Sequence, residues 1–171
     1  MLIGNFMVDL SVSWEDYHRH IETLAVKIYQ SQWQFNQIVC IAKGGLRVGD
    51  ILSRLYDLPL AIVAAASYGG EDKRSREEIK IGQHLAMSND KLGDRILLVD
   101  DLVDSGVSLQ TVSRWLKDYA SPIEELRTAV IWYKSCSQFQ PDYHVEYLAD
   151  NPWIRQPFER YETMSLDDLI N

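Results

Sequence analysis

The sequence predicts an α/β domain of three layers, in which a mostly parallel central sheet is covered by helices on both faces. Short apolar runs alternate along the chain with segments of helical periodicity, as expected where strands are buried on both faces of a parallel sheet. Polar turns follow three of these runs, at Lys43, Ser67 and Asp100. Because ligands bind at the carboxyl ends of the strands in such sheets, we expect these turns to converge on one site.

The first elements are a helix, a strand and a second helix. Ser13 and Asp16 resemble a capping box, and the apolar residues that follow lie on one face of a helix over residues 14–30. Residues 37–42 are uninterruptedly apolar after Gln37 and predict a buried strand. A helix is expected from Val48 to Tyr56, after a turn that contains two glycines.

The middle of the chain predicts further strands. Residues 60–66 and 95–99 are apolar runs of strand length, and residues 126–133 form another. The polar stretch 67–78 has too little apolar surface to pack. Residues 79–87 alternate weakly, which is typical of an edge strand.

A third helix is expected between the last two of these strands. We expect Ser108 to cap it, with apolar residues of helical spacing on its buried face: Leu109, Val112, Leu116 and Tyr119. The tail after Tyr133 shows no clear period until Ser165, which is expected to cap a short terminal helix.

The bulk composition is that of a globular protein without a membrane span. The chain has 171 residues, of which 46% are hydrophobic and 25% charged, and we expect one domain over residues 1–171. No basic N-terminal region precedes a long apolar run, and no stretch reaches the ~18–20 apolar residues of a membrane helix. We therefore expect a cytoplasmic protein without stable membrane insertion. Cys40 and Cys136 are expected to be buried free thiols of a reducing compartment.

The formal net charge of −8 argues against a general nucleic-acid-binding protein. It leaves an anionic small substrate open, because a helix N-terminus and a bound Mg²⁺ can supply a positive field locally.

The most informative stretch is the acidic loop, residues 100–109, which follows a buried strand and opens a helix. Such a turn presents backbone N–H groups and a positive dipole end, which suit a phosphate. Asp100, Asp101 and Asp104 lie beside it and would repel a phosphate unless they bind something else. Sugar hydroxyls and Mg²⁺ are the natural partners of these carboxylates. The loop therefore predicts a site for a phosphorylated sugar.

Two other phosphate-related patterns fit less well. Residues 44–50 have the glycine spacing of a Walker A loop, but Asp50 stands where a phosphate-binding lysine is required. Asp100 and Asp101 are similar to the acidic pair of response-regulator receivers, but that pair belongs on the first strand of such domains and comes late here.

The acidic loop resembles the phosphoribosyl pyrophosphate (PRPP) signature of type I phosphoribosyltransferases, an apolar strand followed by Asp-Asp-x-x-Asp-Thr/Ser-Gly-x-Thr/Ser. The resemblance extends over roughly residues 14–159. Two positions depart from the family pattern: Val107 stands where glycine is frequent, and Lys43 where arginine is common. The other matching segments are Lys43-Gly44-Gly45 for the pyrophosphate loop, Ser67-Tyr68-Gly69 for the mobile lid, and Tyr133-Lys134, Asn151-Pro152-Trp153-Ile154 and Gln156-Pro157-Phe158-Glu159 for the base-binding elements of the xanthine-guanine and hypoxanthine enzymes.

The resemblance implies a purine salvage enzyme, with PRPP and a 6-oxopurine (guanine, xanthine or hypoxanthine) as substrates and Mg²⁺ as cofactor. It also implies a homodimer or homotetramer, a lid over about residues 67–80 that includes Ser67 and Tyr68, and a base-binding hood over about residues 134–160. The implied site residues are Asp104, Asp100 and Asp101 for catalysis, the last two also for the metal; Ser105, Gly106, Val107, Ser108 and Leu109 for the 5′-phosphate; Lys43, Gly44 and Gly45 for pyrophosphate; and Lys134, Trp153 and Ile154 for the base.

A non-proline cis peptide at or next to Ala42–Lys43 is a further expectation from the resemblance. The rival hypothesis is a non-catalytic sensor of PRPP or a nucleotide on the same fold, because fold alone does not determine function.

Overall fold

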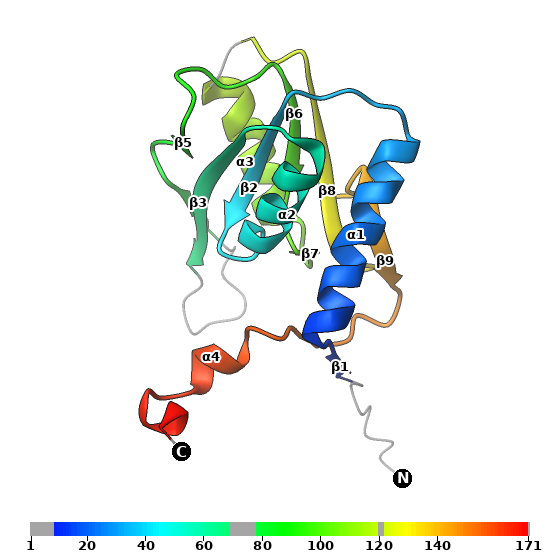
Figure 1. Ribbon diagram of the computed structural model, residues 1–171, viewed down its shortest axis with the longest axis vertical. Helices are drawn as coiled ribbons and strands as arrows, with labels where there is room; N and C mark the ends of the chain where they lie inside the picture. The colour runs from blue at the N-terminus through cyan, green and yellow to red at the C-terminus, as the bar shows by residue number, and fades with distance from the viewer. Residues whose placement is uncertain (1–8, 69–77, 120–121, 171) are drawn as a thin grey trace.

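The computed structural model describes residues 9–68, 78–119 and 122–170. A central sheet runs in the order β4-β3-β2-β6-β8-β7, with β5 paired to β3 and β9 paired to β8 (Figure 1). All pairings are parallel except those of β4 and β5 with β3. The strands are β2 (Gln37–Ala42), β3 (Leu60–Tyr68), β4 (Glu78–Ile81), β5 (Ala86–Met87), β6 (Arg95–Val99), β7 (Leu102–Val103), β8 (Glu125–Lys134) and β9 (Tyr143–Leu148).

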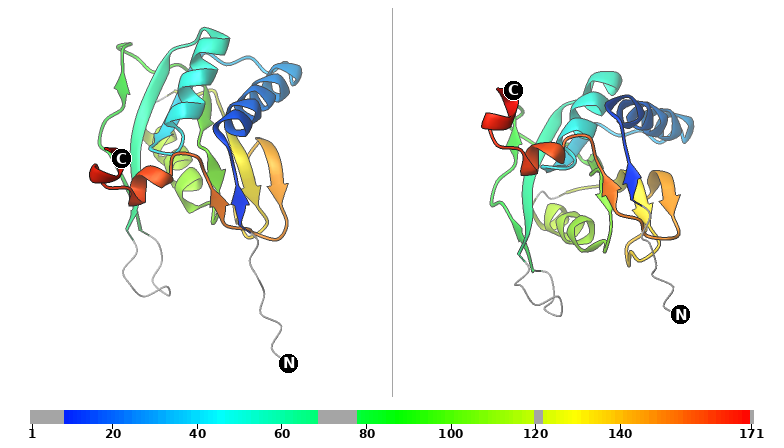
Figure 2. Two further views of the ribbon diagram at one scale, coloured as in Figure 1. Left: turned by 60° about the horizontal axis from the view of Figure 1, so that its bottom comes forward. Right: turned by 90° about the horizontal axis from the view of Figure 1, so that it is seen from below.

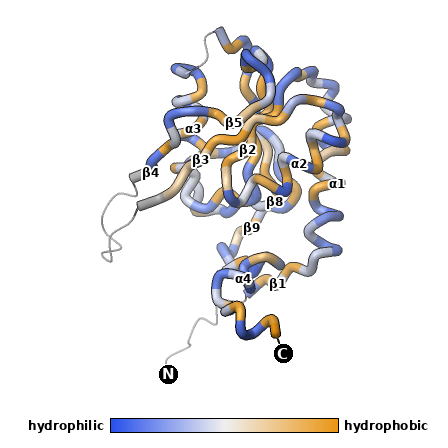
Figure 3. Tube along the Cα trace, turned by 60° about the vertical axis from the view of Figure 1, so that its left-hand side comes forward, coloured by the Kyte–Doolittle hydropathy of each residue, from blue (hydrophilic) through white to orange (hydrophobic). Residues whose placement is uncertain are grey.

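Helices cover both faces of this sheet, so the expected three layers are confirmed. Helices α1 (Trp14–Gln30) and α2 (Leu46–Tyr56) pack on one face and α3 (Val107–Tyr119) on the other (Figure 1). Successive residues of β2 alternate between the two cores: Ile38 and Cys40 face α1 and α2, whereas Val39 and Ile41 face α3. Hydrophobic residues are accordingly concentrated along the inner strands (Figure 3).

Two short strands from distant parts of the chain pair beside the sheet. Strand β1 (Leu10–Ser11) pairs in parallel with β10 (Ile154–Arg155), and Figure 2 shows the two strands side by side. After β10 the chain passes the carboxyl ends of β2 and β3 through α4 (Arg160–Thr163) to a final 3₁₀ turn, Asp167–Leu169 (Figure 1). This passage places C-terminal residues at the edge where the predicted site lies.

Most element boundaries agree with the sequence. The helix over 14–30 and the strand over 37–42 are confirmed as predicted. Helix α2 begins at Leu46, earlier than the expected Val48. The weakly alternating stretch 79–87 supplies two short antiparallel strands, β4 and β5.

Three local expectations are wrong. Ser108 does not cap α3, because the helix begins at Val107 and Ser108 lies in its first turn. Tyr119 is exposed and stacks on Trp115 rather than packing in the core. The tail without apparent period contains β9, which pairs in parallel with β8; its residues are only partly buried, so their pattern is weak.

The predicted lid is only partly described. Ser67 and Tyr68 form the end of β3, where they pair with Ile79 and Glu78 of β4. Residues 69–77, the rest of the polar stretch, lie outside the described residues. Across the described chain, no helix has the length and apolar character needed to cross a membrane.

Gly49 allows α2 to approach β2 closely, which yields a test of the packing. A Cβ at Gly49 would lie 2.6 Å from the Cβ of Cys40, a position with no free space. We expect Gly49→Ala to lower the free energy of unfolding by about 1–3 kcal/mol through overpacking, despite the better helix propensity of alanine. Urea unfolding followed by circular dichroism measures the change.

Gly82→Ala is the matched control for this test. A Cβ at Gly82 would meet Ala64 at 3.5 Å, an ordinary contact, so the variant should be as stable as the parent. Equal stability of both variants would show that α2 does not pack against β2 as described.

Candidate functional site

Three strand ends bring the predicted site residues to one edge of the sheet. Cys40 of β2 is in register with Val99 of β6, and Val99 is in register with Ala129 of β8. The loops after β2 and β6 therefore leave the sheet together. Lys134 is the last residue of β8 and reaches the same edge through the pairing of Tyr133 with Val103 of β7.

The acidic loop encloses a cavity of about 400 Å³. The first helical hydrogen bond of α3 runs from the amide of Gln110 to the carbonyl of Gly106, so the amides of residues 107–109 have no helical acceptor. Helix-start amides of this kind bind phosphate. The cavity is lined by Asp100, Asp101, Leu102, Val103, Asp104, Ser105, Gly106, Ser108 and Leu109.

Gly106 is required where it stands, whereas glycine is not required at the next position. Gly106 has a φ of 85°, and a Cβ there would lie 2.5 Å from the hydroxyl of Ser137. Val107 does not have a positive φ, and it opens α3 in an ordinary helical position. The departure of Val107 from the family pattern therefore leaves the loop backbone unstrained.

Asp100 and Asp101 are a tightly packed acid pair. The amide of Asp101 donates to the Oδ1 of Asp100 at 2.9 Å, and the side chain of Asp101 is 9% exposed. Burial raises the pKa of Asp100 well above its usual value, and the charge of Asp101 raises it further. Burial also raises the pKa of Asp101, against the opposing effect of a hydrogen bond from Gln156. A cation bound here would offset the burial of the two carboxylates and the repulsion between them.

Asp100 and Asp101 could serve as the protein ligands of a magnesium ion whose other ligands come from water and substrate. Among the described residues no group of three or more acidic, histidine or cysteine side chains is placed to hold a metal. Mg²⁺ is typically held by one or two carboxylates together with water and substrate phosphates, so two aspartates are a sufficient protein contribution.

The glycine loop, Lys43-Gly44-Gly45, faces the acid pair. The peptide bond between Ala42 and Lys43 is cis, as expected. A Cβ at Gly44 would lie 2.5 Å from the Oδ1 of Asp101, and one at Gly45 would lie 2.7 Å from the carbonyl oxygen of Val99. Only glycine therefore lets this loop approach the end of β6 so closely.

Lys134 and Asp104 form an ion pair at the end of β8. The Nζ of Lys134 donates to the Oδ2 of Asp104 at 3.0 Å; the lysine side chain is 6% exposed and the aspartate 56%. Cys136 places its sulfur 3.2 Å from the other oxygen of Asp104. Trp153 lies next to this group, with its ring centre 6.0 Å from Nζ and its side chain largely exposed. An exposed indole beside a buried lysine offers a flat face to an aromatic ring.

The pairing of β10 with β1 sets the direction of the Ile154 carbonyl. The carbonyls of Trp153 and Arg155 accept hydrogen bonds from Leu10 and Val12. Because successive carbonyls of a strand point to opposite sides, that of Ile154 points away from β1. The side chain of Ile154 is buried in the core, which anchors this strand.

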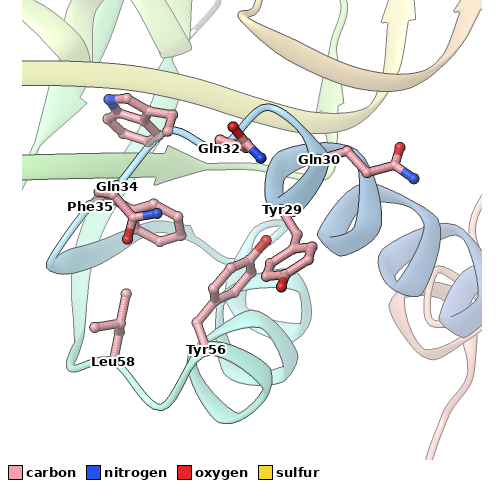
Figure 4. A pocket seen from close by; sticks show the side chains of 8 residues that line it. Tyr29, Gln30, Gln32, Gln34, Phe35, Tyr56 and Leu58 are labelled. Carbon is pink, nitrogen blue, oxygen red and sulfur yellow. The ribbon is translucent and has the colours of Figure 1, made fainter.

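Volume does not identify the site. A larger cavity, of about 780 Å³, lies at the opposite end of the sheet, where α1 and α2 end (Figure 4). Figure 4 shows the rings of Tyr29, Phe35 and Tyr56 around it. All its lining side chains are aromatic, glutamine or leucine, so none is charged to balance a phosphate. It contains none of the predicted site residues.

The comparisons with known proteins agree with this geometry. The sequence matches the family described as phosphoribosyl transferase domain over residues 13–163. The chain belongs to this family. It is 30% identical over 150 residues to a xanthine-guanine phosphoribosyltransferase of Gluconobacter oxydans, an alignment that covers 87% of this chain and 83% of the relative.

Solved structures of the same family superpose on the chain. A xanthine-guanine-hypoxanthine phosphoribosyltransferase of Helicobacter pylori has a TM-score of 0.74 and 25% identity, and covers 95% of this chain and 99% of its own. A purine phosphoribosyltransferase of Pyrococcus horikoshii has a TM-score of 0.71 and 27% identity, with 88% and 93% covered. The type I phosphoribosyltransferase fold and the enzyme class are thereby confirmed.

The structure adds residues to the phosphoribosyltransferase site that sequence reasoning missed. Arg47, in the first turn of α2, lines a cavity of about 630 Å³ with Lys43 and Asp101. Its guanidinium stacks on the ring of Phe158 at 4.3 Å. Its position two residues after the glycine loop could have indicated a second cation there. Gln156 lies in the same cavity; it belongs to a segment matched to the base-binding elements, but its contact with the acid pair has no signal in the sequence.

Cys136 is exposed, so the expectation that both cysteines are buried is wrong for it and confirmed for Cys40. It follows the last residue of β8 in a turn, where the strand pattern no longer applies. Partial shielding of its sulfur from water raises the pKa of the thiol, and so do the hydrogen bond to Asp104 and the charge of that carboxylate. Burial raises the pKa of Cys40 to about 12.

These pKa shifts predict how Cys136 reacts with iodoacetamide. The thiolate is the reactive form, so a raised pKa slows alkylation at pH 8. Asp104→Asn removes the negative charge and should lower the pKa, which shifts the rise of the rate to lower pH. Mass spectrometry of alkylated peptides over pH 7–10 measures this, with the buried Cys40 as the unreactive internal reference.

Asp118→Asn, an exposed change on α3, is the control and should leave the alkylation profile unaltered. An unchanged profile in Asp104→Asn as well would show that Cys136 does not contact Asp104.

Proposed function

We propose that this protein transfers the phosphoribosyl group of PRPP to a ring nitrogen of a 6-oxopurine (guanine, xanthine or hypoxanthine), and so forms a nucleoside monophosphate and pyrophosphate in purine salvage. The observation that carries this is the ion pair of Lys134 and Asp104 beside Trp153, at the rim of the acidic loop. A phosphate site alone would not require these three side chains. Together they provide a lysine donor, a proton acceptor and a stacking surface.

The acidic loop and the glycine loop bind different parts of PRPP. The helix-start amides and hydroxyls of Ser105, Gly106, Val107, Ser108 and Leu109 bind the 5′-phosphate. Asp100 and Asp101 bind the ribose hydroxyls and hold Mg²⁺, which when bound neutralises charge on the leaving pyrophosphate. Lys43, Gly44 and Gly45 meet the pyrophosphate, and Arg47 adds a second cation on that side.

The reacting base lies between Trp153 and the end of β8. Lys134 has donors beyond the one used by Asp104 and directs them to the exocyclic 6-oxygen. The carbonyl of Ile154 accepts from a 2-amino group. As the bond from the ring nitrogen to C1′ forms and the C1′–O bond to pyrophosphate breaks, Asp104 takes the proton of the ring nitrogen. Positive charge develops on the ribose, and the acid pair stabilises it.

Several finer points belong to the same proposal. Residues 1–171 form one domain, with the lid over about 67–80 closing on the intermediate and excluding water. The protein acts in the cytoplasm as a homodimer or homotetramer, on PRPP and a purine base rather than on nucleic acid. The base pocket disfavours the rival function of a non-catalytic sensor where PRPP alone is the ligand, since reading PRPP alone needs no Lys134 or Trp153; a non-catalytic sensor of a nucleotide remains for the assay to exclude.

A single assay tests the function. The purified protein is incubated with PRPP, Mg²⁺ and each of a panel of purines and pyrimidines, and pyrophosphate release is measured. We expect turnover with at least one 6-oxopurine and none with orotate or uracil. Turnover with a pyrimidine alone would overturn the base assignment. Tight PRPP binding without turnover on any base would favour the sensor.

Asp104→Asn tests the proton acceptor. The amide keeps the shape of the side chain but cannot accept the proton, so we expect kcat to fall by about 10²–10⁴-fold. The KM for PRPP should change little, because Asp104 faces the base. Steady-state kinetics measure both, with Asp118→Asn as the control. An unaltered kcat would remove Asp104 from the chemistry.

A further inference from the structure

The side chain of Gln156 makes the closest polar contact to the acid pair from outside the acidic loop. It follows β10 and is 7% exposed. Its amide nitrogen donates to the Oδ2 of Asp101 at 2.5 Å. The contact joins residues that are 55 positions apart in the chain, so it links the hood directly to the ribose and metal side of the proposed site.

Asp101 is confined on its other side by the glycine loop. The position that a Cβ of Gly44 would take is 2.5 Å from Oδ1 and 2.9 Å from Oδ2 of Asp101. The carboxylate therefore lies against a backbone that cannot accommodate a side chain, and it accepts a hydrogen bond from the amide of Gln156. Three elements meet at this one carboxylate: the loop after β2, the loop after β6 and the segment after β10.

Among the described residues, two buried side-chain oxygens without a hydrogen-bond partner belong to Tyr17 and to Gln156 itself, both of which lie near Asp101. They are the hydroxyl of Tyr17 and the Oε1 of Gln156. Burial raises the pKa of Tyr17, with Asp101 as the next cause, so this hydroxyl near the carboxylate stays protonated. An apolar side chain at position 156 would fill the space without leaving an unpaired oxygen. The amide is therefore retained for its donor.

We propose that Gln156 is a positioning residue: its amide holds the carboxylate of Asp101 in place for the ribose and Mg²⁺, and thereby ties the base platform to the ribose site. Trp153 lies three residues before Gln156, on the segment that contains β10, so a fixed Gln156 constrains the position of the indole. This inference rests on the proposed function.

Two substitutions separate the donor from the space that the side chain fills. Gln156→Met keeps the length and removes the donor, and Gln156→Glu keeps the shape and sets an acceptor against Asp101. We expect each to weaken binding of PRPP with Mg²⁺, measured by isothermal titration calorimetry, by about 10–100-fold, as for other groups that orient metal ligands. kcat should fall as well, more in Gln156→Glu than in Gln156→Met, and the KM for the base should rise.

Gln37→Met is the matched control. Gln37 is 1% exposed, and its amide donates to the carbonyls of Ile38 and Pro59, at the starts of β2 and β3, which is the end of the sheet opposite the site. The same loss of a buried amide there should lower the melting temperature and leave kcat and PRPP binding unchanged.

The outcomes distinguish this inference from the proposed function. Parental binding and kcat in both Gln156 variants, with an active parent, would overturn the positioning role alone. Variants that no longer fold would assign Gln156 to structure and overturn it too. A parent protein without turnover on any base would overturn the proposed function instead.

Discussion

The in-register parallel pairing of β2, β6 and β8 is the constraint on which the rest of the molecule depends. Ile38 and Cys40 face one core, and Val39 and Ile41 face the other, with the same alternation in β6. A slip of one residue would exchange the two faces of a strand that is buried on both. The register therefore fixes the positions of the carboxyl ends of these strands relative to one another. The loops of the site begin at these ends, so the register also fixes where each loop begins.

Charge is the second constraint, because an acidic protein must hold an anionic substrate. The chain has a formal net charge of −8. Within the acid pair, burial and the charge of Asp101 raise the pKa of Asp100 well above its usual value. Positive field comes from separate sources on either side: the amides that open α3, and the cations Lys43 and Arg47. In the proposed function the acids therefore separate two anion sites, which is the arrangement needed when a ribose lies between a phosphate and a pyrophosphate.

The parts that could be predicted from the sequence are those in which one local pattern decides the structure. The buried strands and α1 have unbroken or strictly periodic apolar residues, and their bounds were predicted within a few residues. The acidic loop combines a strand, a turn glycine and a helix start, each with its own sequence signal. Strand β9 was missed because its residues are half-buried and show no clean alternation.

Contacts that join distant segments gave no such signal. Gln156 is an amide in an aromatic, proline-containing tail, and its partner Asp101 is recognisable only in the folded chain. Arg47 has the same property, since the ring on which it stacks, Phe158, belongs to that tail. Cys136 follows a buried strand, and the apolar run before it suggested burial where the chain in fact turns outward. For Gln156 and Arg47, the sequence shows the residue but not the distant residue that it contacts. For Cys136, it does not show where the strand ends.

The hood shows why these distant contacts matter for the chemistry. Among the described residues, strand β10 is paired to the short β1, and Trp153 before it is 56% exposed, so burial of the indole itself does little to fix its position. Its position depends instead on the buried Ile154, on the hydrogen bond from Gln156 to Asp101 and on the stacking of Phe158 on Arg47. Two of these three contacts end on residues of the loops that would bind ribose and pyrophosphate. In the proposed function, Trp153 and the PRPP site are therefore positioned by the same contacts, and a change in one is transmitted to the other through the side chains of Gln156 and Phe158.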